Sequence, residues 1–243
     1  IPVHLYGHCC NMDELTKIAK KNKIQVIEDA AQATGAKYKN NFLGTIADFG
    51  GFSFYGNKII TTGEGGIILF KNKKFYKKFY SLKNHGREKK GVFEHKTIGY
   101  NFMFTEMQAA IGNIQLKKLN KILDKKKKIF NFYKKNLINI KEISFMKPLN
   151  TNKPVYWFSN IIVDKKKELQ KFLSKNNVET RDMFLPLNKQ PCFKNKNYIK
   201  NLNSNFKNSI YIYQKGLSLP SHYNLTIKDL KYVVNKINIF FNK

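Results

Sequence analysis

The amino-acid sequence predicts an α/β fold with a mainly parallel sheet, followed by a smaller α+β unit. An apolar run, an amphipathic helical segment and a second apolar run follow one another over residues 1–28, which is the order of a βαβ unit. Two more apolar runs flank a glycine-rich segment within 51–70. The composition changes after Pro148, so we expect a large domain over 1–148 and a small domain over 149–243.

The first three elements are predicted from two apolar runs and a helix cap. Ile1–Leu5 is a short strand candidate that ends in a turn. Asn11, with Glu14 three residues later, can cap the helix that follows. The run Ile24–Glu28 is apolar enough for a strand buried in a parallel sheet. In open α/β sheets ligands bind at the carboxyl ends of such strands, and Asp29 stands at this end.

The middle of the chain is predicted to extend the sheet. Residues 37–50 contain two glycines and indicate a loop or hairpin. Gly51–Tyr55 and Ile67–Phe70 are strand candidates on either side of a glycine-rich turn. Within 72–83, large apolar side chains recur at helical spacing, so we expect a helix that packs back on the sheet.

A long helix and the small domain complete the chain. Thr105, with Gln108 three residues later, predicts a capping box, and apolar spacing continues the helix to about Leu137. The small domain is predicted to contain strands at Val155–Val163, Val178–Arg181 and Leu217–Leu219, helices at Lys165–Asn176, Ser209–Lys215 and Thr226–Phe241, and a loop over Leu185–Asn205.

The chain is strongly basic, but its composition does not favour nucleic-acid recognition. Its 243 residues include 45 Lys and Arg against 16 Asp and Glu, a formal charge of +29. Only Arg87 and Arg181 are arginine, whereas specific recognition of phosphates and bases favours the arginine fork. We therefore expect no specific nucleic-acid partner. A basic nucleic-acid-binding protein that keeps a degenerate enzyme fold is the alternative hypothesis.

The cysteines indicate neither a disulfide framework nor a zinc site. Cys9 and Cys10 are adjacent and Cys192 stands alone, which matches no metal-binding spacing. We therefore expect no metal and a reducing, cytoplasmic setting. No apolar run approaches the roughly 20 residues that cross a bilayer, so no membrane insertion is expected.

The segment Phe52–Gly66 is the strongest candidate for chemistry. It places Lys58 between an apolar run and a second glycine-rich turn, which presents one side chain at the mouth of a sheet. Asp29 ends another apolar run, so the acid and the lysine are expected at neighbouring strand ends. A lysine that forms a Schiff base needs a lowered pKa, and an aspartate can keep a pyridine nitrogen protonated. A solvated loop lysine and a turn or helix-capping aspartate are the alternative interpretations.

Three motifs follow in order along the chain: IEDAAQA at 27–33, FSFYGNK with TTGEGG at 52–66, and GYN with QAAIG at 99–112. They resemble the nucleotide-sugar aminotransferases of the DegT/DnrJ/EryC1/StrS family. The resemblance implies a pyridoxal-phosphate enzyme of the type I aspartate-aminotransferase fold. Residues 1–148 would be the C-terminal part of the large cofactor-binding domain with the long connecting helix, and 149–243 the small domain.

The resemblance also implies roles for individual residues. Lys58 would be the Schiff-base lysine for pyridoxal 5′-phosphate, Asp29 would contact the pyridinium nitrogen, and Gln32 would lie against the ring. Ser53 would bind the cofactor phosphate. Asn101 would reach the phosphate of the neighbouring subunit, which implies a homodimer.

The implied reaction moves an amino group from glutamate to the keto carbon of a nucleotide-linked 4-keto-6-deoxy sugar, for surface polysaccharide or glycan synthesis. Within the family, the motifs are most similar to members that aminate C4 of a GDP-linked sugar. Relatives that dehydrate have histidine in place of the lysine, so Lys58 indicates amino transfer. An inactive partner subunit that donates Asn101 to a complete neighbour is a further alternative.

The chain also departs from the family at its start. Family members carry about a hundred further residues before the opening strand, including a glycine-threonine or glycine-serine turn that holds phosphate at a helix N-terminus. They also carry an aromatic side chain there that stacks on the cofactor ring. We therefore expect the sequence to be N-terminally truncated and its large domain to be incomplete.

Overall fold

The residues that the structure describes pack around two hydrophobic cores, one in each of two units. A computed structural model describes residues 1–89, 91–149, 152–193 and 206–242. Unit 1 comprises residues 1–124 and 148–157, and unit 2 comprises 125–147 and 158–243. These units follow the packing of the chain; the domain assignment of 1–148 and 149–243 stays a prediction.

Unit 1 contains the segment Phe52–Gly66, which carries Lys58, and a small mixed sheet. Its elements are η1 (Leu5–Gly7), α1 (Met12–Lys21), β1 (Ile27–Asp29), β2 (Lys37–Tyr38), β3 (Asn41–Phe42), β4 (Phe49–Ser53), β5 (Gly66–Phe70), η2 (Lys73–Phe75), α2 (Tyr76–Lys83), α3 (Glu106–Lys117) and β7 (Asn152–Lys153). Helix α4 (Leu119–Leu137) begins in unit 1 and continues into unit 2.

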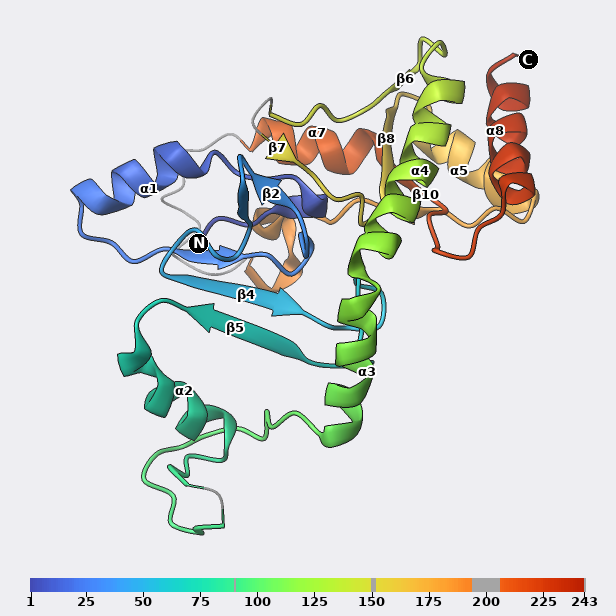
Figure 1. The fold of residues 1–243 in the computed structure, drawn as a ribbon. Helices are drawn as coiled ribbons and strands as arrows, with labels where there is room; N and C mark the ends of the chain where they lie inside the picture. Colours follow the sequence, from blue (N-terminus) through green and yellow to red (C-terminus); the bar gives the residue numbers. More distant parts are fainter. Residues whose placement is uncertain (90, 150–151, 194–205, 243) are drawn as a thin grey trace. The chain divides into compact units, whose positions relative to one another are not determined.

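The main sheet of unit 1 has the strand order β1-β4-β5. Strands β1 and β4 are parallel, with Asp29 opposite Gly51, whereas β5 runs antiparallel to β4 (Figure 1). The predicted strand Ile1–Leu5 is wrong, because only Val3 forms a bridge, parallel to Asp29. The chain turns into η1 directly afterwards, where Tyr6 has a left-handed backbone with φ 55°.

The strand predicted at Ile24–Glu28 is shorter and less buried than expected. Strand β1 begins at Ile27, and the side chains of Ile24 and Ile27 are 61% and 44% exposed. Val26 and Glu28 are buried. This alternation is that of a strand with one packed face, not of one buried on both faces.

The local signals for hairpin and helices in unit 1 are confirmed. Strands β2 and β3 form the expected hairpin, and Asn11 caps α1 by accepting a hydrogen bond from the Glu14 amide. Phe79 of α2 packs against β4 and β5, with its ring 5.9 Å from that of Phe49 and 5.2 Å from that of Phe70.

The long helix predicted after Thr105 is two helices. The capping box forms as expected, with the Thr105 hydroxyl accepting a hydrogen bond from the Gln108 amide. Helix α3 ends at Lys117, however, and α4 starts at Leu119. The Lys118 amide donates to the Gln115 carbonyl, three residues back, which is the tighter turn that closes a helix end.

Unit 2 is an antiparallel sheet of order β6-β8-β10-β9 packed with helices. Its further elements are β6 (Ile143–Ser144), β8 (Ser159–Val163), α5 (Lys166–Lys175), β9 (Arg181–Asp182), η3 (Leu187–Lys189), η4 (Pro191–Phe193), α7 (Lys207–Lys215), β10 (Gly216–Leu219) and α8 (Ile227–Phe241). Strands β8 and β10 are buried along their whole length and form the centre of this core.

The predictions for unit 2 hold for its helices and partly for its strands. Helices α5, α7 and α8 and strand β10 lie where they were expected. The strand predicted at Val155–Val163 starts only at Ser159. The strand predicted at Val178–Arg181 is wrong except for its last residue, because β9 spans Arg181–Asp182. The loop predicted over 185–205 contains η3 and η4, and its residues 194–205 lie outside the described part of the chain.

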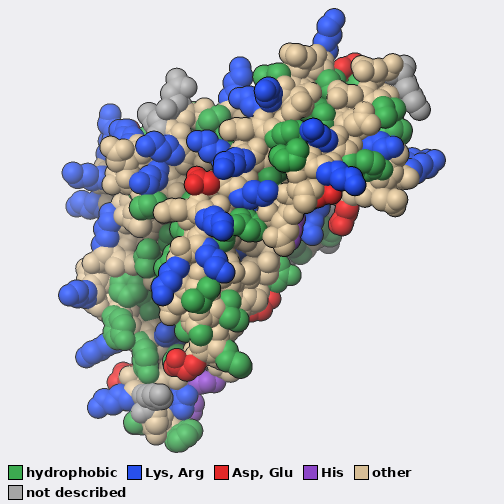
Figure 2. All heavy atoms as spheres, turned by 45° about the vertical axis from the view of Figure 1, so that its right-hand side comes forward, with side chains coloured by type: hydrophobic (Ala, Val, Ile, Leu, Met, Phe, Trp, Pro, Cys, Tyr) green, Lys and Arg blue, Asp and Glu red, His purple; other side chains and the backbone are tan. Residues whose placement is uncertain are grey.

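The basic side chains are spread over the surface. On the face drawn in Figure 2, lysines and arginines alternate with hydrophobic and neutral side chains and do not form one continuous patch. Within the described ranges, no helix has the length and apolar character needed to cross a bilayer.

Candidate active site

Lys58 lies in the loop that connects β4 to β5. Its amide donates to the Tyr55 carbonyl at 3.0 Å, which closes a tight turn directly before the lysine. The next two residues, Ile59 and Ile60, are buried at 5% and 4% exposure. The loop is closed at its base by the amide of Thr62, which donates to the Phe54 carbonyl at 2.9 Å. Lys58 is therefore presented by a fixed backbone.

The glycine-rich turn after the lysine is shaped by Gly65. This residue has φ 137°, and a Cβ at this position would collide with the ring of Phe104, so only glycine fits. The adjacent carbonyl of Glu64 accepts a hydrogen bond from the Thr62 hydroxyl at 2.6 Å. It accepts a second one, at 3.0 Å, from the side-chain Nε2 of Gln108 in α3. Helix α3 thus fastens the turn that follows Lys58.

The acid predicted to pair with Lys58 stands at the end of β1. Asp29 is half-buried, and its Oδ1 accepts a hydrogen bond from the Ala31 amide at 3.0 Å. Burial lowers the pKa of Lys58 below its usual value, and the negative charge of Asp29 opposes this shift. The structure therefore brings the lysine and the aspartate within electrostatic range of each other, as the order of strand ends predicts.

Gln32 is connected to the same region through Tyr6. Its Oε1 accepts a hydrogen bond from the Tyr6 amide at 2.7 Å, which leaves the amide nitrogen of the side chain as a donor. The Tyr6 ring stacks on that of Trp157, with centroids 6.4 Å apart and planes 25° apart. The residues predicted from the motifs are thus linked by two aromatic residues that were not predicted.

Trp157 contacts the lysine directly. The Lys58 Nζ lies 4.2 Å from the centroid of its ring, and its Nε1 donates to the Asn57 carbonyl at 2.7 Å. The sequence pattern places Trp157 in a strand of the small domain, but residues 152–157 return to unit 1, where β7 pairs with β2. Trp157 stands out in the sequence as the only tryptophan. No sequence pattern, however, indicates that residues 152–157 pack in unit 1.

The two predicted phosphate ligands lie in different segments. Ser53 is the last residue of β4 and is half-buried, and its Oγ accepts a hydrogen bond from the Tyr55 amide at 3.3 Å. Its hydroxyl hydrogen can still be donated. Asn101 lies between α2 and α3, pairs with Asn84 through a backbone bridge and is exposed. The roles assigned to both residues stay predictions.

A buried carboxylate supports the strand that carries Asp29. Glu28 accepts hydrogen bonds from His4 Nε2 at 3.1 Å and from the amides of Gly44, Ile46 and Ala47 at 2.7 Å each. Burial raises the pKa of Glu28, but these hydrogen bonds outweigh it and hold the pKa below its usual value. Glu28 is thus an ionised side chain whose hydrogen bonds connect β1 to the loop at residues 44–47.

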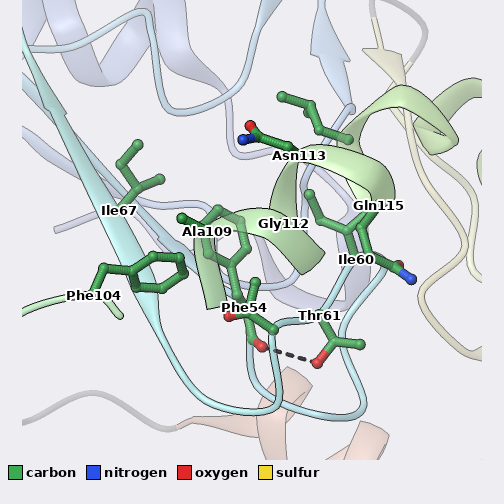
Figure 3. Close-up of a pocket in the computed structure, with 11 residues that line it drawn as sticks. Phe54, Ile60, Thr61, Ile67, Phe104, Ala109, Gly112, Asn113 and Gln115 are labelled. Carbon is green, nitrogen blue, oxygen red and sulfur yellow. Dashed lines mark hydrogen bonds between the residues drawn. The ribbon is translucent and has the colours of Figure 1, made fainter. Parts of the chain in front are cut away.

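A cavity of about 220 Å³ lies beside the lysine loop (Figure 3). Phe54, Ile60 and Ile67 from the loop and β5 line it together with Phe104 and Ala109, and the Thr61 hydroxyl donates to the Phe54 carbonyl at 3.0 Å. Neither the lysine nor the aspartate lines this cavity, and none of its lining side chains titrates. It therefore lacks the groups for catalysis.

Comparison with protein families gives a match over nearly the whole chain. The model described as the DegT/DnrJ/EryC1/StrS aminotransferase family matches residues 1–238.

Individual relatives agree with this match. GDP-perosamine synthase of Escherichia coli O157:H7 is 33% identical over 243 residues, which cover 99% of this chain and 65% of the relative. A Bacillus subtilis protein with the provisional name pyridoxal phosphate-dependent aminotransferase EpsN is 31% identical, over 93% of this chain and 59% of the relative. The chain thus spans slightly less than two thirds of the length of these curated relatives.

A solved structure has the same fold. The crystal structure of S. venezuelae DesV in complex with a ketimine intermediate superposes with a TM-score of 0.90 at 25% identity, covering 99% of this chain and 64% of that chain. The predicted α/β transferase fold, incomplete relative to its neighbours, is therefore confirmed.

Proposed function

This chain belongs to the DegT/DnrJ/EryC1/StrS aminotransferase family, and from this premise we propose that the protein transfers an amino group to the keto carbon of a nucleotide-linked sugar, with pyridoxal 5′-phosphate as cofactor. The observation that carries the proposal is the placement of Lys58 and Asp29. Strand β1, which ends at Asp29, is the parallel neighbour of β4, and Lys58 lies in the loop that follows β4. A half-buried lysine with a lowered pKa stands within electrostatic range of an aspartate at a strand end.

The side chains present fit this cofactor. Burial lowers the pKa of Lys58, so its amine more readily loses the proton that blocks attack on an aldehyde. The Asp29 carboxylate can accept a hydrogen bond from a protonated ring nitrogen. Gln32 and Ser53 each keep a donor free for the ring substituents and the phosphate. The donors and acceptors therefore match the polar groups of pyridoxal 5′-phosphate.

Each of these side chains has a distinct task in the proposed reaction. Bound pyridoxal phosphate supplies an electron-accepting ring that stabilises negative charge on the carbon bearing the amino group. Asp29 keeps the ring nitrogen protonated, which strengthens this effect. Lys58 binds the cofactor covalently through Nζ at rest, and as a free amine it carries a proton from one carbon to the next. Gln32 orients the ring.

A second subunit completes the proposed site. Ser53 binds the phosphate from within the chain, and Asn101, which is exposed, reaches the phosphate in the neighbouring subunit. This assignment follows the GYN motif and requires a homodimer. It predicts that mixing a chain lacking Lys58 with one lacking Asn101 restores one intact site per mixed dimer.

The proposed substrates are glutamate as amino donor and a GDP-linked 4-keto-6-deoxy sugar as acceptor. The identity to GDP-perosamine synthase and the motif GNKIITTGEGG at 56–66 support this choice of sugar. We place the reaction in the cytoplasm, where it would supply surface polysaccharide or glycan synthesis. The alternative of a nucleic-acid-binding protein has no support in the comparisons, nor has that of an inactive partner subunit.

The direct experiment replaces Lys58 with alanine in the protein expressed from its complete reading frame. We expect the visible absorbance of the bound cofactor and the amination of the GDP-linked keto sugar both to disappear. Lys77→Ala, at an exposed lysine of α2, is the control and should change neither. A purified Lys58→Ala protein that still turns over would show that the assignment is wrong.

A further inference from the structure

We propose that Trp157 is the positioning residue for Lys58, an inference that rests on the proposed function. Trp157 fixes the lysine at both ends. Its ring faces the ammonium group, with Nζ 4.2 Å from the ring centroid, and its indole nitrogen donates to the carbonyl of Asn57. Asn57 directly precedes the lysine, so one side chain holds both the backbone and the reactive tip of Lys58.

These contacts matter because a lysine side chain is long and flexible. Fixing it in one arrangement costs conformational entropy. The face of tryptophan attracts an ammonium, and the attraction is stronger when the pair is desolvated. Trp157 is 2% exposed and Lys58 is half-buried, so this attraction offsets part of the entropy loss.

Contacts of residues 6, 7 and 155 hold the segment that carries the tryptophan. The Val155 amide donates to the Gly7 carbonyl at 3.2 Å, and a Cβ at Gly7 would collide with the Val155 carbonyl. Tyr6, which stacks on Trp157, has a left-handed backbone at φ 55°. For a bulky residue this conformation is strained, and such strained residues cluster at functional sites.

The same arrangement connects the lysine to the ring-orienting glutamine. The amide of Tyr6 donates to Gln32 Oε1 at 2.7 Å, and the Tyr6 ring stacks on that of Trp157. Gln32 and Lys58 are therefore held relative to each other through Tyr6 and Trp157. A change at Trp157 is expected to alter the direction of Lys58 without removing any group that reacts.

The test measures how fast pyridoxal phosphate attaches to Lys58. The complete protein is exposed briefly to the cofactor and reduced with borohydride, and peptide mapping gives the label on Lys58 and on every other lysine. Relative to wild type, Trp157→Leu should slow labelling of Lys58 about tenfold, because the amine is no longer held in one direction. Trp157→Phe, which keeps a ring but loses the indole N–H, should slow it several-fold. Surface lysines should be labelled at unchanged rates.

Phe42→Leu is the matched control. Lys37 Nζ lies 4.3 Å from the centroid of the Phe42 ring, nearly the same geometry outside the site, and its loss should leave labelling of Lys58 unchanged. Far-UV circular dichroism selects a temperature at which the variants are folded; if Trp157→Leu does not fold, Trp157→Phe carries the test. Labelling of Lys58 at the wild-type rate in the folded variants would overturn the proposal.

A second readout does not depend on the cofactor. Trp157 is the only tryptophan, so tryptophan emission comes from this one ring, which Lys58 contacts. Lys58→Met should shift or brighten this emission, and Phe42→Leu should not. If wild-type labelling shows no preference for Lys58, the proposed function fails. If emission is the same in wild type and Lys58→Met, the role of Trp157 is refuted whether or not the cofactor binds.

Discussion

At the level of single residues, a substitution of Asp29 should lower the rate of amination without preventing attachment of the cofactor. In Asp29→Asn the side chain keeps its size, but no negative charge remains to hold the ring nitrogen protonated. We expect the cofactor still to attach to Lys58, while the amination rate falls on the order of 10²–10³-fold, as for other lost electrostatic contacts at active sites. Absorbance and single-turnover amination measure the two effects. Wild-type amination by Asp29→Asn would remove Asp29 from the mechanism.

Glu28 is predicted to govern stability and not chemistry. Glu28→Gln removes a buried charge that accepts four hydrogen bonds, and should lower the free energy of unfolding by about 3–5 kcal/mol. Asp13→Asn is the control, because the Asp13 side chain is 60% exposed in its pair with Lys39, and its substitution should change the free energy of unfolding far less. Urea unfolding followed by Trp157 emission measures both.

The Glu28 carboxylate should also make the free energy of unfolding depend on pH in the acid range. The folded pKa of Glu28 lies below its unfolded value, so its contribution is complete above about pH 4.5 and is lost as the pH falls through the folded pKa. Unfolding of the wild type should therefore become easier below about pH 4.5, and Glu28→Gln should show less of this decline. Equal acid dependence in both proteins would contradict the account.

At the scale of elements, the turn after Lys58 offers a matched pair of glycines. Gly63 and Gly65 both have positive φ, but an added Cβ has open space at Gly63 and meets the Phe104 ring at Gly65. An alanine is strained at either position because φ is positive, but only Gly65→Ala also collides with the Phe104 ring. The free energy of unfolding of Gly65→Ala should therefore be lower than that of Gly63→Ala by at least about 1 kcal/mol. Thermal unfolding compares them. A Gly65→Ala protein as stable as Gly63→Ala would mean that the turn is not fixed by this packing.

The sequence predicts a helix or turn correctly where residues close in the chain determine it. The caps at Asn11 and Thr105 and the glycines around Lys58 act within a few residues, so the helices and the lysine loop were predictable. Strand limits and Trp157 were not, because they depend on distant pairing. Strand β7 joins β2 across more than a hundred residues of chain, and apolar spacing contains no information about that partner.

At the scale of the whole molecule, the charge of +29 predicts weak and unspecific contacts with polyanions. The sequence has only two arginines, and the basic side chains are scattered over the face drawn in Figure 2. The protein should therefore bind duplex DNA at low salt and release it by about 0.2 M salt, because counterion release dominates such binding. Fluorescence anisotropy against a salt series measures this. Sequence-dependent binding that persists at that ionic strength would contradict it.

The central claim is that one lysine among 43 holds the cofactor because the fold lowers its pKa and fixes its position. The most direct measurement is the site and stoichiometry of pyridoxal phosphate fixed by borohydride in the complete wild-type protein, read by mass mapping. We predict one cofactor per chain, attached to Lys58. Label spread over many lysines in proportion to their exposure would contradict the account.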